Sequence, residues 1–197
     1  FSSLGDVVCR ELCKALMGCR ALTELNLSGN GIYKEGPRAI GSLVRGHTAL
    51  EDLDVHFNHI MGDCARDLVR GLHENGQMGG RLKSVNLSWN PLGKVGGEET
   101  CRALAQLFAD AAKLTHVDIS KCDLAFGHCQ ILADGLQSNT TILGIHVQGN
   151  AGRMDAWGFL VPVRTPLQAP VGRPSPEGPA SGGSTLESAV QVNRSTS

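Results

Sequence analysis

The sequence has no long hydrophobic run, no excess of charge of either sign and few aromatic residues. None of its apolar stretches approaches the roughly 20 residues that a helix needs to cross a bilayer. The net charge of −1 and the isoelectric point near 6.7 argue against a surface that is basic throughout, which nucleic acids or anionic lipids would require. The sequence therefore predicts a partner that is neither a nucleic acid nor a membrane.

The chain also lacks the short motifs that most often accompany catalysis or cofactor binding. It contains no G-x-x-x-x-G-K-[ST] phosphate loop, no G-x-S-x-G nucleophile turn, no C-x-x-C pair and no H-E-x-x-H metal motif. We therefore expect no enzyme activity, no cofactor and no small-molecule substrate.

Two clusters contain residue types that bind metals, and we interpret both as polar residues on a solvated strand. Asp54 and His56 point to the same side of an extended chain, but His59 and Cys64 follow in a turn and in the next segment. The second cluster is His116 with Asp118, beside Cys122. The spacing does not bring three ligands of either cluster together, so we predict no metal site.

The sequence contains seven cysteines, an odd number that cannot be fully paired in disulfides within the chain. Most occupy positions that face the interior in the repeat pattern described below. We interpret them as small buried hydrophobic residues, which is typical of a reducing compartment and predicts a cytoplasmic protein. They are Cys9, Cys13, Cys19, Cys64, Cys101, Cys122 and Cys129.

The stretch LTELNLSGNGI, residues 22–32, has the features of a short strand that ends in a turn. Leu25 and Leu27 are two residues apart, so both point to one face of an extended chain. Asn30 follows where the strand must end, and its amide can bond to the backbone of a bend. The stretch predicts a strand closed by an asparagine.

The same pattern occurs five times along the chain. The position of Asn30 is repeated at Asn58, Asn90, Cys122 and Asn150, in steps of 28, 32, 32 and 28 residues. Aliphatic residues fill the strand positions before each of these. A recurrence this regular indicates a repeat architecture and decides the fold before any other feature.

The segments between the strands have helical spacing. In residues 36–50, apolar residues lie at Ala39, Ile40, Leu43 and Val44, and residues 98–114 show a similar pattern. Pro37 suits the first turn of a helix. Each unit is thus a strand, a turn and a helix, and it must stack on its neighbours to bury its apolar face.

The pattern LxxLxLxxNxL in residues 22–32 resembles leucine-rich repeats of the ribonuclease-inhibitor-like subfamily, and the resemblance extends over about residues 4–150. Cysteine in the asparagine position, as at Cys122, is a variant known in that family. The resemblance implies an α/β fold: a right-handed solenoid shaped as a horseshoe arc, with a parallel sheet on the concave side and helices on the convex side.

We expect two regions, a repeat domain in residues 1–160 and a disordered Pro/Gly/Ser-rich tail in residues 161–197. The first residues match the second half of a repeat, because Leu4 and Cys9 align with Leu124 and Cys129. This alignment predicts that the chain is a fragment of a longer solenoid. The segment 155–160 is expected to cap the last repeat through Trp157 and Leu160.

The outward positions of the strands form columns in such a stack, and these columns contain the candidate binding site. The first two columns hold four carboxylates and no lysine or arginine, which predicts an acidic face and a basic partner. Phe57 and Trp89 occupy equivalent places in adjacent repeats, which predicts neighbouring exposed rings. The candidate partner-binding residues are Asp52, Asp54, Phe57, Asn86, Trp89, His116 and Asp118.

These features favour a non-catalytic interaction module or scaffold that binds a protein or peptide on the concave strand face. The resemblance leaves two alternatives: a GTPase-activating protein of the Ran-activating type, or the sensor region of a NOD-like receptor. For the GTPase-activating alternative, the rim residues to consider are Arg38, Asn58 and Asn90. An inert spacer in a larger receptor is a further possibility.

Overall fold

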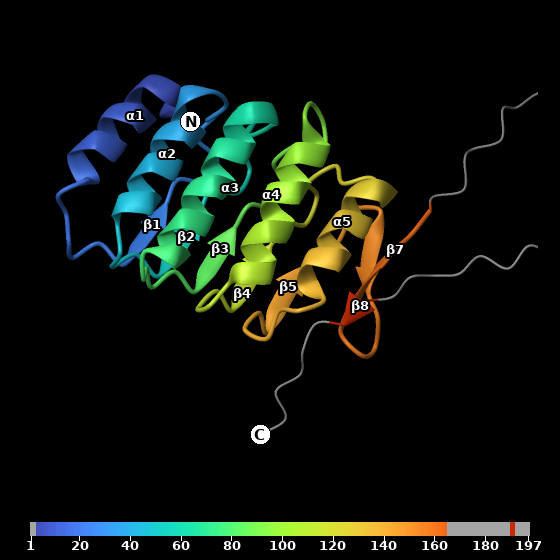
Figure 1. Ribbon diagram of the computed structural model, residues 1–197. Coiled ribbons are helices and arrows are strands. Elements are labelled where there is room, and N and C mark those ends of the chain that lie inside the picture. Colours follow the sequence, from blue (N-terminus) through green and yellow to red (C-terminus); the bar gives the residue numbers. More distant parts are fainter. Residues whose placement is uncertain (1–2, 165–189, 192–197) are drawn as a thin grey trace, which may run out of the picture.

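The computed structural model describes residues 3–164 and the short strand at residues 190–191. Its main sheet consists of five parallel strands arranged in chain order (Figure 1). Each strand is three residues long and is paired in register with the next, so the repeats stack without any offset. The strands are β1 (Glu24–Asn26), β2 (Asp52–Asp54), β3 (Ser84–Asn86), β4 (His116–Asp118) and β5 (Gly144–His146).

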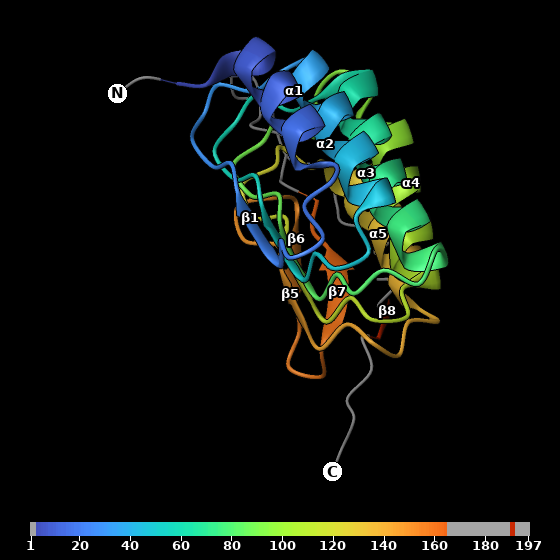
Figure 2. The ribbon, with the colours of Figure 1, turned by 90° about the vertical axis from the view of Figure 1, so that its left-hand side faces the viewer.

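Five helices form a second layer on one side of this sheet (Figure 2). They alternate with the strands along the chain, and neighbouring helices lie side by side in the same order as the strands (Figure 1). The predicted solenoid, with the parallel sheet on its inner side and helices outside, is confirmed. The helices are α1 (Gly5–Leu16), α2 (Glu35–Gly46), α3 (Gly62–Gln77), α4 (Gly97–Asp110) and α5 (Phe126–Leu136).

The core lies between the two layers and is continuous from repeat to repeat. The middle residue of every strand points into it, and these residues pair across the sheet in the order Leu25, Leu53, Val85, Val117 and Ile145. All five are buried. The expected pile of aliphatic side chains is therefore present, and it leaves the flanking strand positions on the opposite, outward face.

The two 32-residue repeats have longer helices than the others. Helices α3 and α4 contain 16 and 14 residues, against 11 or 12 in the other three. Glycine decides how closely α2 and α3 approach: a Cβ on Gly71 would lie 2.2 Å from the carbonyl oxygen of Gly41. Backbone therefore packs directly on backbone at this point.

The first helix belongs to the predicted half repeat. It packs beside α2, and Asp6 of α1 accepts hydrogen bonds from the backbone N–H groups of Tyr33, Lys34 and Glu35 at 2.8–2.9 Å. Asp6 thus caps the start of α2 from the neighbouring repeat. Two leucines of α1, Leu12 and Leu16, are only half-buried, because α2 is the one described helix that packs beside them.

After the last repeat the chain forms a small antiparallel sheet beside α5 (Figure 1). It comprises β6 (Gly152–Met154), β7 (Phe159–Pro162) and β8 (Val190–Gln191). Leu160 is buried, as expected for a cap, but the prediction for Trp157 was wrong: this residue lies in the turn between β6 and β7 and is 68% exposed. The indole therefore lies mostly in solvent and does not cap the last repeat.

The expected domain boundary at residue 160 falls inside β7. Most of the expected tail, residues 165–189 and 192–197, lies outside the described residues, and so does its predicted disorder. Among the helices that the structure describes, none combines the length and the apolar character needed to cross a membrane.

The seven cysteines are all free thiols, and six of them are buried. Burial raises the pKa of Cys101 and Cys122 to about 12 and that of Cys129 to about 11. These side chains therefore remain protonated and pack as small apolar groups, as the sequence predicts.

Candidate functional site

The outward strand positions form the columns that the repeat pattern predicts. Glu24 pairs with Asp52, and in the same register Asn26 pairs with Asp54. The register continues unbroken through all five strands. The first column is Glu24, Asp52, Ser84, His116 and Gly144, and the second is Asn26, Asp54, Asn86, Asp118 and His146.

A third row runs across the strands where each one has just ended, and it has an unusual backbone. Phe57, Trp89 and Lys121 all have positive φ angles, of 53°, 56° and 55°. The equivalent positions in the first and last repeats are Gly29 and Gly149, with φ of 67° and 76°. We call these five positions the left-handed row. The turn has a left-handed backbone in all five repeats. Glycine, which adopts this conformation without strain, occupies the position in the first and last of them.

The left-handed row is held in place by backbone hydrogen bonds between repeats. The N–H of Phe57 donates to the carbonyl of Ser88 at 3.0 Å, and the N–H of Trp89 donates to the carbonyl of Ser120 at 2.9 Å. A bulky residue in this conformation costs about 1 kcal/mol or more. The surrounding ladder thus holds three side chains in a conformation that glycine would adopt without strain.

The aromatic side chains of the row lie together and face solvent. Phe57 is 63% exposed and Trp89 is 54% exposed. Their ring centroids are 6.3 Å apart, with the planes inclined at 65°, an edge-to-face arrangement. The Lys121 Nζ lies 5.8 Å from the centre of the Trp89 ring. The predicted pair of exposed rings is confirmed, and Lys121 extends it; the role of these residues in binding stays a prediction.

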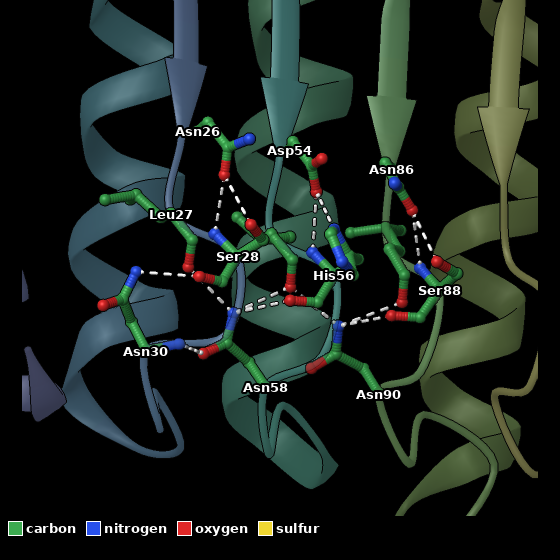
Figure 3. A network of polar contacts seen from close by, with 12 residues as sticks. Asn26, Leu27, Ser28, Asn30, Asp54, His56, Asn58, Asn86, Ser88 and Asn90 are labelled. Carbon is green, nitrogen blue, oxygen red and sulfur yellow. Dashed lines mark hydrogen bonds and ion pairs between the residues drawn. The ribbon is translucent and has the colours of Figure 1, made fainter. Parts of the chain in front are cut away.

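The second column has a structural task that the sequence analysis missed (Figure 3). One side-chain oxygen of Asp54 accepts hydrogen bonds from the backbone N–H and the ring Nδ1 of His56, at 2.9 and 2.8 Å. Asn86 and Asp118 bond in the same way to the N–H two residues ahead, at 3.1 and 2.8 Å. An Asp or Asn followed two residues later by Ser or His, at the end of each of the first four strands, was the available signal.

The two remaining candidates, both in the first column, are more exposed to solvent. Asp52 is exposed, and no hydrogen bond or ion pair ties its carboxylate to another described residue. His116 is also exposed; its Nδ1 lies 3.2 Å from Thr115 Oγ1, and its ring lies against the bare backbone of Gly144. Both side chains are accessible to a partner on the strand face.

Beneath the columns, the asparagines of the repeat pattern hold the turns in place (Figure 3). The amide nitrogen of Asn58 donates to the carbonyls of Leu27 and Val55 at 3.0 and 2.9 Å. Its oxygen accepts from the N–H groups of Asn30 and Ile32, both at 3.0 Å. Each such side chain therefore links its own turn to that of the preceding repeat and fixes the backbone that carries the left-handed row.

Cys122 takes the same position with a different chemistry. Its Sγ donates to the carbonyl of Leu87 at 3.3 Å, but a thiol has no amide oxygen to accept two backbone N–H groups at once. The link to the following repeat is unaffected, since the oxygen of Asn150 accepts from the N–H of Cys122 and of Leu124 at 3.0 and 3.1 Å.

The three residues considered for a GTPase-activating role do not form a surface. Asn58 and Asn90 are 3% and 0% exposed. Arg38 lies on α2, in the helix layer, where it is paired with Glu35 and Asp67 at 2.8 and 3.0 Å. The two asparagines are therefore structural, and Arg38 lies in the other layer of the fold.

The residues of the first cluster of metal-binding types also form contacts within the protein. Asp54 bonds to His56, while Cys64 Sγ donates to the carbonyls of Tyr33 and Met61. Within residues 3–164, no three side chains of His, Cys, Asp or Glu lie close enough together to hold a metal ion.

Comparison with known proteins agrees with this architecture. A sequence model of the family described as Leucine Rich repeat matches residues 18–41 and 82–99. The ribonuclease inhibitor of Sus scrofa is 30% identical over 143 residues, which are 72% of this chain and 30% of the inhibitor. NACHT, LRR and PYD domains-containing protein 13 of Homo sapiens is 28% identical over 151 residues, 76% of this chain and 14% of that protein.

A solved structure with a similar fold is that of the leiomodin-1 actin-binding site 2. The TM-score is 0.51 at 16% sequence identity, and the match covers 66% of this chain and 73% of that one. At this identity the likeness concerns the fold alone.

The chain is a leucine-rich repeat protein. Its unit of 28 to 32 residues, its full outer helices and its relatives make its repeats ribonuclease-inhibitor-like. It spans about 30% of the length of the ribonuclease inhibitors it matches, and 14% of the human NACHT protein.

Proposed function

We propose that this chain is a non-catalytic interaction module or scaffold that binds a protein or peptide on its concave strand face. The contact surface consists of the left-handed row and the two columns beside it. Its central residues are Asp52, Asp54, Phe57, Asn86, Trp89, His116 and Asp118.

The left-handed row supports this proposal most directly. Phe57 and Trp89 expose large rings to water from a backbone conformation that favours glycine. Neither the hydrophobic effect nor the backbone favours these residues in the isolated chain. Exposed aromatic residues rimmed by polar groups are typical of the centres of protein interfaces. Strain of this kind tends to be kept where a side chain serves binding.

The charges of the columns suggest the chemistry of the partner. Glu24, Asp52 and Asp54 lie on the first two strands, and these strands carry no outward lysine or arginine. We infer that the partner presents basic side chains to this half of the face. Complementary charges of this kind mainly increase the association rate and the specificity.

The similar proteins support a protein partner as a class. Two of their names state a protein target: ribonuclease for the inhibitors, and actin for the leiomodin-1 segment. The free thiols favour a reducing environment, and we propose a cytoplasmic location on that ground.

The same surface could belong to either of two kinds of larger protein. Alongside the ribonuclease inhibitors, the relatives include NACHT, LRR and PYD domains-containing proteins, so the chain is equally compatible with the sensor region of a receptor. The sequence adjoining this chain in its gene distinguishes them: a nucleotide-binding module there supports a receptor, and further repeats alone support an inhibitor or scaffold.

A glycine substitution in the left-handed row tests the proposed surface. Phe57→Gly and Trp89→Gly together remove both rings and relax the backbone, so the free energy of unfolding should stay within about 1 kcal/mol of wild type or rise. Partners captured by the wild-type protein from a lysate, and identified by mass spectrometry, should be lost from the double variant.

Trp157→Gly is the matched control. This tryptophan is also highly exposed, but it lies in the β6–β7 turn, which is not part of the five-stranded sheet. Its removal should leave the captured partners unchanged. If the double variant captures the same partners as wild type, the left-handed row is not the binding surface.

A further inference from the structure

The charges on the strand face are separated from one end of the stack to the other. Glu24 and Asp52, both exposed, lie on β1 and β2. On the opposite half, His116, Lys121 and His146 are exposed, and Asp118 is the single carboxylate there. The middle strand contributes only neutral outward residues. The face is therefore acidic over β1 and β2 and close to neutral over β4 and β5, where Lys121 supplies the one ammonium, so a dipole runs along it.

The two ends of this dipole are not neutralised within the described part of the chain. Glu24 and Asp52 form no ion pair there, and neither does Lys121, whose ammonium lies over the Trp89 ring. The charges just outside the columns do pair: Lys83 Nζ lies 2.6 Å from Glu51, and Lys94 Nζ lies 3.4 Å from Asp123. We call Glu24, Asp52 and Lys121 the open charges, because they are unpaired among the described residues and so available to a ligand.

On this face, the backbone N–H groups along the sheet are already used in hydrogen bonds between repeats. The N–H groups of Leu27, Val55, Leu87 and Ile119 already donate to the next strand, at 2.8–3.0 Å. An extended peptide lying across the face would find no backbone partners, whereas a helix satisfies its own backbone internally. A helical ligand is therefore favoured over a strand.

The positions of the open charges set the spacing that such a helix needs. Asp52 and Lys121 are two strands apart, about 10 Å, and differ by five residues along the strand direction, at most about 17 Å. The diagonal between them is on the order of 15–20 Å. Eleven residues of helix span about 16 Å and return to the same face of the helix.

We propose that the strand face binds an amphipathic helix of about three turns, lying diagonally across β2, β3 and β4. A basic residue at position i of that helix meets Glu24 and Asp52. Apolar residues at i+7 and i+8 pack on Trp89 and Phe57. An acidic residue at i+11 meets Lys121. This inference rests on the proposed function and adds the shape and charge order of the partner.

Three synthetic helical peptides of identical composition test the charge order by fluorescence titration or calorimetry. All carry the same apolar pair, and they differ in whether the two ends of the binding face are Arg and Glu, both Arg, or both Glu, with the balancing residues on the outer face. Wild-type protein should bind the mixed peptide at least about tenfold more tightly than either other peptide.

Lys121→Glu makes both ends of the protein surface acidic and should reverse the preference, so that the peptide with two arginines binds best. Trp89→Ala should weaken binding of the mixed peptide about tenfold or more. Circular dichroism checks that both variants are folded, and Lys121→Met provides a second change at the same end that removes the charge without reversing it.

Each outcome is decisive for the charge order. Tightest binding of the all-arginine peptide by wild type, still weakened by Trp89→Ala, overturns the dipolar helix but leaves the proposed binding surface intact. Failure of all three peptides to bind also overturns the helix. The proposed function is then judged separately by the captured partners of the Phe57 and Trp89 glycine variant.

Discussion

At the residue scale, the asparagine that ends each strand shows how one side chain can support two repeats. Asn90 is fully buried; its amide nitrogen donates to the carbonyls of Val55 and Leu87 at 2.9 and 3.0 Å. Its oxygen accepts from the N–H of Ile60 at 3.1 Å. The side chain therefore satisfies backbone groups on both sides of the gap between β2 and β3.

Asn90→Ala should lower the free energy of unfolding by about 2–4 kcal/mol, because several buried backbone groups lose their partners at once. Urea unfolding followed by circular dichroism measures this, with an unchanged dependence on urea concentration. Asn26→Ala is the control: among the described residues this exposed side chain bonds to Ser28 alone, and its loss should cost less than about 1 kcal/mol, by the same scale. Equal effects of the two changes would contradict the role assigned to the buried asparagine.

Asp6 gives the stability a defined dependence on pH. Burial disfavours its charge, but hydrogen bonds from the backbone of Tyr33, Lys34, Glu35 and Gly36 outweigh burial and lower the pKa of the carboxyl. Because the pKa is lower in the folded state, the stabilisation is complete above the unfolded pKa, near 4, and is lost as the pH falls through the folded pKa.

Asp6→Ala should cost about 1–2 kcal/mol at pH 7, the usual value for a helix cap. The difference in free energy of unfolding from wild type should stay constant from about pH 7 to pH 5 and shrink below about pH 4. Glu11→Ala serves as control on the same helix, since Glu11 is exposed and, within the part of the chain that the structure describes, pairs with Arg10 and Lys14 alone. A difference for Asp6→Ala that persists unchanged at pH 2 would rule out the charged cap.

At the element scale, helix α3 contains two glycines that should respond to alanine in opposite directions. A Cβ at Gly71 would lie 2.2 Å from the carbonyl oxygen of Gly41 on α2, whereas a Cβ at Gly76 would meet nothing within 4 Å. Both residues have helical backbones, so their intrinsic preference for alanine is the same. Only the neighbouring helix distinguishes them.

Gly71→Ala should therefore destabilise the protein by about 2 kcal/mol or more, because α2 must move away from α3. Gly76→Ala should stabilise it by about 0.5–1 kcal/mol through helix propensity and a less flexible unfolded chain. Thermal or urea unfolding of the two variants measures both effects. If Gly71→Ala were also stabilising, the close packing of the two helices would be incorrect.

At the scale of the whole molecule, the features that recur were predictable and those that occur once were not. The spacing of Leu25, Leu27 and Asn30 fixes a unit, and five copies of it fix the stack and the positions of Phe57 and Trp89. The left-handed backbone of this row could not be inferred from Phe or Trp, which rarely adopt it. The orientation of Trp157 was missed because the β6–β7 hairpin has no counterpart in the repeats.

The stack should also determine how the molecule opens. Each repeat contacts only its neighbours, so its local stability depends on how much apolar surface they cover. Leu132 of α5 is fully buried, whereas Leu12, its equivalent on α1, is half-buried, because α2 is the one described helix that packs on α1. Opening should therefore begin at α1 and leave the central repeats closed.

Hydrogen exchange of this chain, followed by mass spectrometry, measures that order. Amides of α1 should exchange at least about tenfold faster than those of α3, which has a helix on both sides. Leu12→Ala should accelerate exchange in α1 and leave α3 nearly unchanged, whereas Leu68→Ala, in the centre of α3, should accelerate exchange in α3 and in its neighbours α2 and α4. Equal rates in α1 and α3 of the unmodified chain would mean that the repeats open as one unit, and a stack governed by nearest-neighbour contacts would then not describe this protein.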